Sequence, residues 1–409
     1  MSSLLISEAI HSIPSQLRQN SRILTGATQR TARLHGADRV EYNFDSQPVI
    51  SIELPANSYY DMAYSSLQFN VEADNGAELL VGAASLFRKI LIRGSDGRIL
   101  CESDCVDLLN SALVDFTINS TQQNTGLAIT ALTGDGTAGV ARRTFTTANN
   151  KKSCAIQPLL ELCRYDRYLP CHLLGKLTIE FYLQDPRICF KHTGAVGYKI
   201  TNVLYRCDKV EFTAEVENLM MQAWAADKLR FHFKYWKSTT FSQIDQKARL
   251  TIRNSDHSVN ALLVVPRLAS KTVAQNANSY ERVFGNIEEI SVAAGNNIIE
   301  RINCRYGAGP AFFELQKMLD FSENTTVDPR TWAGDGTGVD ADKGTKFALG
   351  LNLETVTNHG DAISGYMGRG DIVVEFLRTV APAEPIVYTC FLLVDATICS
   401  SQNEGTRVV

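Results

Sequence analysis

The sequence predicts two similar antiparallel β-sandwich domains arranged in tandem. A seven-residue phrase occurs twice, as residues 175–181 (GKLTIEF) and residues 370–376 (GDIVVEF), nearly half a chain length apart. Each copy is followed by a proline, Pro186 or Pro382, and then by another apolar segment rich in β-branched residues. Strand-like segments are dense in both halves, and the alternation of strands with long helices that marks a parallel sheet is absent. A pattern this short also recurs by chance, so the duplication has to be judged from the other predicted elements.

The chain length and the net charge limit the classes of protein to which this chain can belong. The 409 residues are enough for two or three domains, and each half is long enough to bury an adequate core. The formal net charge is −4 and the isoelectric point is about 6.0. Coating a nucleic acid requires clustered Lys and Arg, so this balance argues against a protein that binds nucleic acid over its whole surface.

The cysteines and the start of the chain bear on where the protein resides. Most of the ten cysteines lie inside apolar runs, where they behave as small buried hydrophobic residues. No basic segment followed by an apolar core opens the chain, and no apolar run approaches eighteen residues. We expect free thiols in a reducing compartment, with neither a signal peptide nor a transmembrane segment.

Residues 1–39 differ in composition from the rest of the chain and are predicted to be an N-terminal arm. Apolar residues recur at helical spacing near the start, and basic residues then come with almost no acids. The arm could dock on a partner or an inner surface with a weak affinity for anions, or it could be a strapped-down terminus, and the sequence favours neither. The basic residues of the arm are Arg18, Arg22, Arg30, Arg33 and Arg39.

The first domain is predicted over residues 40–212. Alternating strands are expected at 40–44, 49–54 and 67–71, and a hairpin at 86–101 turns at Gly94-Ser-Asp-Gly97. Ser103 is expected to cap a helix that runs to about Phe116. Residues 119–153 are rich in Thr, Asn, Gly and Ala and are predicted to form a long loop, before strands at 175–183 and 198–212.

The second half repeats this order. Residues 213–227 are predicted to form a linking helix, with Glu215 and Glu217 in its first turn. The second domain is expected over 228–400, with a short helix opened by Gly309-Pro310, a second long loop at 322–345, and a C-terminal tail at 401–409.

Motifs for catalysis, cofactors or metals are lacking in the sequence. No two of the seven histidines lie within five residues of each other, and Cys101 and Cys105 lack the second cysteine pair that a zinc site requires. The glycine-rich segments 134–139 and 334–338 lack the Lys-Ser/Thr of a phosphate-binding loop. Asp335, Asp340 and Asp342 miss the spacing of a calcium-binding loop. We therefore assign no catalytic, cofactor-binding or metal-binding residue.

One segment has a composition typical of nucleic-acid binding. In residues 228–237 (KLRFHFKYWK), basic residues alternate with Phe231, Phe233 and Tyr235. Aromatic side chains in a basic groove bind single strands. The period of two instead places all three aromatic side chains on one face of a half-buried strand, and we prefer that interpretation.

Several phrases, taken in order, resemble a known family. Residues 54–71 (LPANSYYDMAYSSLQFNV) and 85–94 (SLFRKILIRG) are similar to early strands of double jelly-roll major capsid proteins, above all those of polinton-like viruses, adintoviruses and virophages. Residues 169–181, 347–354 and 387–397 resemble late strands of the same family. The resemblance covers about residues 40–400 and omits the arm.

The resemblance implies a mainly β fold of two tandem eight-stranded antiparallel jelly rolls with a few short helices. It also implies a structural role without catalysis: a homotrimer that forms a pseudo-hexagonal capsomer and tiles the icosahedral shell of a DNA virus. The expected partners are neighbouring capsomers and the penton and minor capsid proteins, together with a weak contact of the arm's arginines with the genome or inner components. No small-molecule substrate or cofactor is expected, and the expected location is the virion, after assembly inside the host cell.

Other classes of protein remain open on the sequence alone. A minor capsid or vertex protein of the same virus group usually carries one roll, which the repeat argues against. A non-viral β-sandwich binding protein would more often be secreted with paired cysteines. A metal-dependent jelly-roll enzyme is disfavoured by the histidine spacing.

Overall fold

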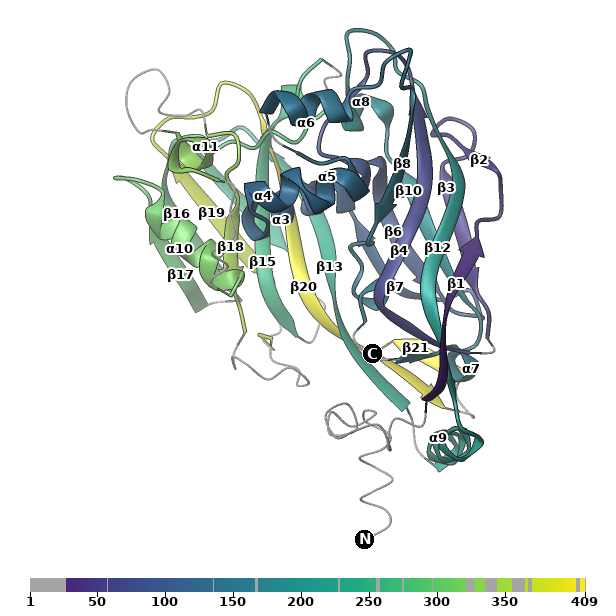
Figure 1. The fold of residues 1–409 in the computed structure, drawn as a ribbon. Helices are drawn as coiled ribbons and strands as arrows, with labels where there is room; N and C mark the ends of the chain where they lie inside the picture. The colour runs from purple at the N-terminus through teal and green to yellow at the C-terminus, as the bar shows by residue number, and fades with distance from the viewer. Residues whose placement is uncertain are drawn as a thin grey trace.

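A computed structural model gives the fold. It describes residues 27–408 apart from gaps at 57, 135, 166–167, 227–228, 255–257, 274–275, 296, 321–326, 335–343, 355–364, 367–369 and 402–404. Two β sandwiches stand side by side, with their long strands running in the same general direction (Figure 1). We call them the first roll and the second roll.

The first roll packs two antiparallel sheets face to face. The strands of one sheet lie in the order β1 (Ala27–Gly36), β12 (Tyr198–Phe212), β4 (Tyr59–Ala73) and β8 (Lys151–Ile156), with the short β2 (Glu41–Tyr42) on β12 and β9 (Tyr168–Pro170) on β4. The other sheet has the order β3 (Val49–Leu54), β10 (Leu177–Leu183), β6 (Phe87–Arg93) and β7 (Ile99–Asp104).

The second roll repeats this plan. Its first sheet has the order β13 (Leu229–Gln243), β20 (Ile386–Ser401), β15 (Val259–Leu268) and β18 (Leu349–Asn352), and the last strand, β21 (Gly405–Val408), pairs with β20. Its second sheet has the order β14 (Lys247–Ile252), β19 (Ile372–Arg378), β16 (Ile287–Ala294) and β17 (Asn297–Asn303).

The two rolls share one strand order. Leaving out β2, β5, β9, β11 and β21, one sheet of each roll contains its first, eighth, third and sixth strands, and the other contains the second, seventh, fourth and fifth. This is the order of a jelly roll. The repeated phrase falls on β10 and β19, which are the seventh strands of their rolls, so the prediction of two similar tandem β sandwiches is confirmed.

The alternation of buried and less buried side chains explains why these segments form strands. Along β10, buried residues alternate with half-buried ones from Leu177 to Leu183, and β19 has the same period. A strand places successive side chains on opposite faces, so this period puts one face into the sandwich. The hairpin predicted at Gly94–Gly97 is confirmed, because β6 and β7 pair across it.

The helices are short and lie mostly in the connections. They are α3 (Val106–Thr117), α4 (Ser120–Asn124), α5 (Gly126–Ala131), α6 (Gly136–Arg143), α7 (Cys171–Leu174), α8 (Pro186–Cys189), α9 (Ala214–Ala226), α10 (Gly309–Met318) and α11 (Pro329–Ala333). Three 3-10 turns, η1 (Ala83–Leu86), η2 (Glu161–Cys163) and η3 (Ala269–Lys271), and the small pair β5 (Glu78–Leu79) and β11 (Phe190–Lys191) complete the described elements.

The structure corrects the first predicted loop. Residues 119–153 carry α4, α5, α6 and the start of β8, and α4 begins at a capping box between Asn119 and Gln122. Such short helices have too few turns to show an apolar period. In the second predicted loop, 322–345, the structure describes α11, with Asp328 at its N-cap, while residues 322–326 and 335–343 lie outside the described residues.

The start of the predicted first helix is also different. Helix α3 begins at Val106, and the residue before it, Cys105, has a left-handed backbone with φ 53°. Ser103 belongs to β7 and is buried there, so it does not cap the helix.

Two predicted boundaries, between the arm and the first roll and between the second roll and the tail, are wrong. Residues 27–36 of the predicted arm form β1, which pairs with β12 in the first roll, so that roll begins well before residue 40. At the other end, the predicted tail contains β21, which extends the sheet of the second roll by pairing with β20. Both strands lie at sheet edges, where few side chains are buried and the apolar alternation is weak.

Candidate functional site

The two rolls interlock through a helix. Helix α3 follows β7 of the first roll, but its apolar residues Leu108, Leu109, Ala112 and Phe116 belong to the core of the second roll. Figure 1 shows α3 in front of the second roll, beyond the sheets of the first. Leu108, Leu109 and Phe116 each contribute about 1.5–3 kcal/mol when they leave water, so α3 joins the rolls strongly. We call this region, where α3 and β7 meet the second roll, the junction.

A buried carboxylate lies inside the junction. The Oδ2 atom of Asp107 on α3 accepts hydrogen bonds from Nε2 of Gln184 at 2.8 Å and from the hydroxyl of Tyr280 at 2.9 Å. Gln184 belongs to the first roll and Tyr280 to the second. Burial raises the pKa of Asp107, and the hydrogen bonds from Gln184 and Tyr280 work in the opposite direction. Asp107 therefore fixes the rolls relative to each other at a cost in desolvation.

An ion pair lies at the other end of α3. The Asp115 carboxylate contacts the guanidinium of Arg282 and lies 2.9 Å from Nζ of Lys346, both from the second roll. Arg282 is only 1% exposed, and its guanidinium lies over the ring of Phe116 at 5.2 Å. Trp332 meets the same ring edge-on at 5.6 Å. The side chains of α3 thus place opposite charges and aromatic rings in one water-poor contact.

The second roll also reaches into the first. Strand β13 lies against β7 and η2 of the first roll. Phe233 of β13 and Ala396 and Ile398 of β20 belong to the core of the first roll. Each roll therefore completes its core with residues of the other.

The segment with alternating basic and aromatic residues forms part of β13. Phe233 is buried, and Phe231 and Tyr235 pack against the core of the first roll. On the opposite face, Nζ of Lys234 lies 3.0 Å from Glu354. The half-buried strand is confirmed, and the aromatic rings are used for packing rather than for stacking on bases.

The remaining sequence candidates are not gathered into a site. Cys101 and Cys105 are free thiols, and burial raises the pKa of Cys105 to about 11, so this thiol is unreactive at neutral pH. Among the described residues, no three His, Cys, Asp or Glu side chains are placed to hold a metal ion. Asp335, Asp340 and Asp342 lie outside the described part of the chain.

In the glycine-rich segment 134–139, other protein atoms lie directly against the glycines. A Cβ atom at Gly139 would lie 2.2 Å from the carbonyl oxygen of Gly134, and that carbonyl accepts a hydrogen bond from Arg143. The tight approach explains the glycines without a phosphate. Residues 335–338 of the second glycine-rich segment are outside the described residues.

The arginines of the predicted arm do not form one cluster in the described region. Arg30 on β1 lies 2.7 Å from Asp208 and 3.2 Å from Asp61, so its charge is largely balanced. Arg33 is exposed on the same strand, and Arg39 lies 3.7 Å from Asp38. Arg18 and Arg22 fall outside the described residues.

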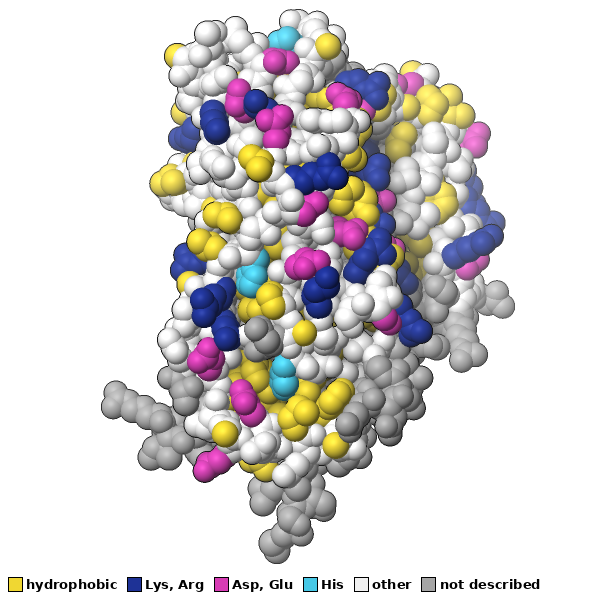
Figure 2. Space-filling model, turned by 90° about the vertical axis from the view of Figure 1, so that its right-hand side faces the viewer, with side chains coloured by type: hydrophobic (Ala, Val, Ile, Leu, Met, Phe, Trp, Pro, Cys, Tyr) yellow, Lys and Arg dark blue, Asp and Glu magenta, His cyan; other side chains and the backbone are white. Residues whose placement is uncertain are grey.

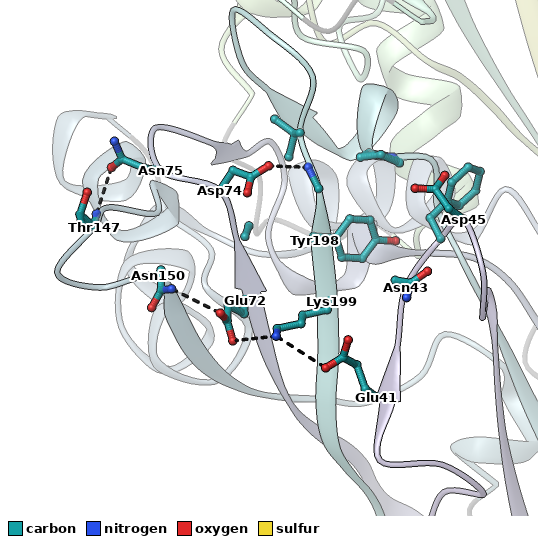
Figure 3. A pocket seen from close by; sticks show the side chains of 15 residues that line it. Glu41, Asn43, Asp45, Glu72, Asp74, Asn75, Thr147, Asn150, Tyr198 and Lys199 are labelled. Atoms are coloured by element: carbon teal, nitrogen blue, oxygen red, sulfur yellow. Dashed lines mark hydrogen bonds and ion pairs between the residues drawn. The ribbon is translucent and has the colours of Figure 1, made fainter.

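A hollow of about 580 Å³ lies at one end of the first roll, between β2, β4 and β12 (Figure 3). Nζ of Lys199 stands 3.6 Å from Glu41 and 3.7 Å from Glu72, and the Glu72 carboxylate also accepts from Asn150. Asp74 accepts the backbone N–H of Gly197 at 2.6 Å. These groups bind one another across the hollow, so we assign it to the packing of loops.

In the part of the chain that the structure describes, no helix has both the length and the apolar character needed to cross a bilayer.

Comparison with known proteins identifies solved structures with a similar fold. No protein-family model and no curated protein sequence matches the chain. Among solved structures, the Faustovirus major capsid protein matches with a TM-score of 0.60 and 9% identity, over 98% of this chain and 99% of that one. The PBCV-1 virus capsid matches with a TM-score of 0.59 and 9% identity, over 93% and 96%. The mavirus major capsid protein matches with 0.56 and 10%, over 96% and 92%.

These matches cover both rolls and their junction. At such low identity they show the fold and not the activity. The chain therefore has the double jelly-roll fold found in major capsid proteins of large DNA viruses and of a virophage, as the sequence resemblance predicted.

Proposed function

We propose that this chain is a major capsid protein that assembles as a homotrimer into a pseudo-hexagonal capsomer of an icosahedral DNA-virus shell. The observation that carries the proposal is the doubled roll: the same strand order occurs twice, over the length that three capsid proteins share with this chain. Three copies of two similar rolls give a ring with six similar sides, which can pack in a hexagonal array.

The architecture suits a mechanical role. The two rolls share their cores at the junction, so one chain is a stiff block with two similar parts. The partners follow from this role: two further copies, neighbouring capsomers, and penton and minor capsid proteins. The arginines predicted for the arm (Arg18, Arg22, Arg30, Arg33 and Arg39) would make a weak contact with anions of the genome or of inner components, and the protein's place would be the virion.

The runner-up classes receive less support. A minor capsid or vertex protein with one roll does not match the two-roll architecture. A non-viral β-sandwich binding protein needs a recognition site, and the polar groups of the hollow near Lys199 are engaged with one another.

Light scattering and electron microscopy of the purified protein test the proposal. We expect a particle of three times the 45.2 kDa of one chain and a hexagonal outline in negative stain. A stable monomer at micromolar concentration, with no ordered assembly at higher concentration, would contradict the trimer and the capsomer together.

A further inference from the structure

Two edge strands meet at the junction, and each has an equivalent strand in the other roll that faces outward. At the junction, the fifth strand of the first roll, β7, lies against the first strand of the second roll, β13. Both strands are sheet edges, and edge strands need cover because their free backbone groups and side chains invite pairing. Here each edge covers the other, and Leu100 and Cys101 of β7 and Phe233 of β13 are buried.

The equivalent edges at the two ends of the chain are exposed. The fifth strand of the second roll is β17, where the neighbouring residues Ile298 and Ile299 lie at a β-bulge against β16 and are both exposed, Ile298 by 62%. The first strand of the first roll is β1, where Leu34 is 58% exposed. Apolar side chains on uncovered edge strands indicate a contact that a single chain does not complete.

The helix that follows the fifth strand shows the same contrast. Helix α3 follows β7 and is covered along its whole length, whereas α10 follows β17 and covers only its own roll, with Ala311 and Leu315 buried. On the outer side of α10, Phe313 is 53% exposed, and Tyr306, just before the helix, is 92% exposed. The outer side of α10 is thus the counterpart of the side of α3 that fills the second roll.

Charge favours contact between these two sides. Strand β1 carries no acidic residue, and of its two arginines Arg30 is paired with Asp208 and Asp61, which leaves the exposed Arg33 as the positive charge of this strand. Strands β16 and β17 carry Glu288, Glu289 and Glu300 against Arg301, which pairs with Glu289 at 3.2 Å, and α10 adds Glu314 and Lys317. Figure 2 looks onto the side of the first roll, where Lys and Arg side chains lie among apolar and acidic ones. Opposite charge at the rim of an apolar patch guides association and fixes register.

We propose that the side formed by β17 and α10 binds the β1 side of a second copy of this chain, in the way that β7 and α3 meet β13 within one chain. The contact joins two different surfaces, so it is heterologous, and it closes into a ring after three copies when inner and outer junctions have the same angle. The inference rests on the proposed trimer and adds the surfaces that form it.

Mixing two interface variants tests the pairing of surfaces. Leu34→Asp places a charge on the β1 side, and Ile298→Asp places one on the β17 side. Each variant alone should lose the trimer, with at least a tenfold rise in the concentration at which half the chains are trimeric. An equimolar mixture should give a heterodimer of twice 45.2 kDa by native mass spectrometry, because one intact surface of each kind remains.

The control is Val380→Asp, on the turn between β19 and β20, where the side chain is 66% exposed. This variant should remain trimeric. Circular dichroism checks that each variant folds, and Leu34→Ser with Ile298→Ser replaces any aspartate variant that does not.

The outcomes separate the two proposals. A monomeric wild type overturns the trimer itself. A trimeric wild type whose Leu34 and Ile298 variants also remain trimeric overturns the assigned surfaces and leaves the trimer standing. Variants that are monomeric alone and stay monomeric when mixed show that these two surfaces do not bind each other.

Discussion

Asp107 shows how a single residue can couple the two rolls and make their stability depend on pH. Its carboxylate is buried between Gln184 of one roll and Tyr280 of the other, and burial raises its pKa. The folded protein therefore keeps this proton at pH values where the unfolded chain has lost it. The stabilisation from Asp107 is fully present below the ordinary carboxyl pKa of about 3.9 and is lost as the pH rises through the raised value.

The variant Asp107→Asn cannot titrate at this position. We expect the free energy of unfolding of the wild type, minus that of Asp107→Asn, to fall from about pH 4 upward, with a slope of at most about 1.4 kcal/mol per pH unit. Urea unfolding at several pH values measures it. Asp328→Asn is the control with the opposite sign, because hydrogen bonds from Thr331 lower the pKa of Asp328. A difference for Asp107→Asn that is flat between pH 4 and 7 would contradict the raised pKa.

Removal of the Asp115 carboxylate should be much more costly than removal of an exposed one. In Asp115→Ala, the buried Arg282 guanidinium loses its anionic partner, and breaking such a pair costs about 3 kcal/mol or more. Glu53→Ala is the control, because Glu53 pairs with Lys176 at 2.7 Å on an exposed surface, and such pairs contribute less than about 1 kcal/mol. Equal losses in chemical denaturation would show that Arg282 finds other partners.

None of these junction residues could be identified from the sequence. Asp107 and Asp115 belong to a predicted helix, but Tyr280 and Arg282 lie more than 150 residues away along the chain, in a segment without a motif. A contact between domains depends on the final packing, and no local pattern records it. The absence of a catalytic motif was visible in the sequence, whereas the polar network at the junction was not.

At the scale of elements, the strands were predictable because their signal is local. The alternation of apolar and polar residues along β10 and β19 directly predicts one buried face. Helices α4 to α6 gave no such signal, because with eight residues or fewer they have too few turns to show a helical period. Strand β1 was missed for a related reason: as an edge strand it buries little, and its partner β12 is distant in sequence.

The repeated glutamates test whether the two seventh strands are equivalent. Glu180 on β10 lies 2.8 Å from Arg93 on the neighbouring strand, and Glu375 on β19 lies 3.0 Å from Lys247 on its neighbour. Glu180→Lys and Glu375→Lys each replace a cross-strand attraction by repulsion. Both should lower the free energy of unfolding by a similar amount, about 1 kcal/mol.

Urea unfolding measures the effect on stability, and light scattering measures the effect on the proposed trimer. Glu180→Gln and Glu375→Gln, which remove the charge without reversing it, should show smaller and again similar losses. A large loss of stability or assembly in only one of the two lysine variants would contradict the equivalence of the strands.

At the scale of the whole molecule, the exchange of core residues predicts that the two rolls unfold as one cooperative unit. The core of the second roll contains Phe116 from α3, and the core of the first roll contains Phe233 and Ile398 from the second. Unfolding either roll alone would expose apolar side chains that belong to the other. The sequence repeat indicated two domains, but it carried no information on this exchange, which depends on how the rolls are placed side by side.

We therefore expect a single unfolding transition for the full chain in scanning calorimetry, at a fixed protein concentration. Phe116→Ala at the junction should lower stability by about 3 kcal/mol, and the whole transition should move to lower temperature. Phe181→Ala, in the core of the first roll and away from α3, is the matched control and should shift the same single transition. If instead the wild type unfolds in two separate steps, and Phe181→Ala moves only one of them, the rolls are independent domains. In that case the contacts of α3 would hold together two parts that are each stable on their own.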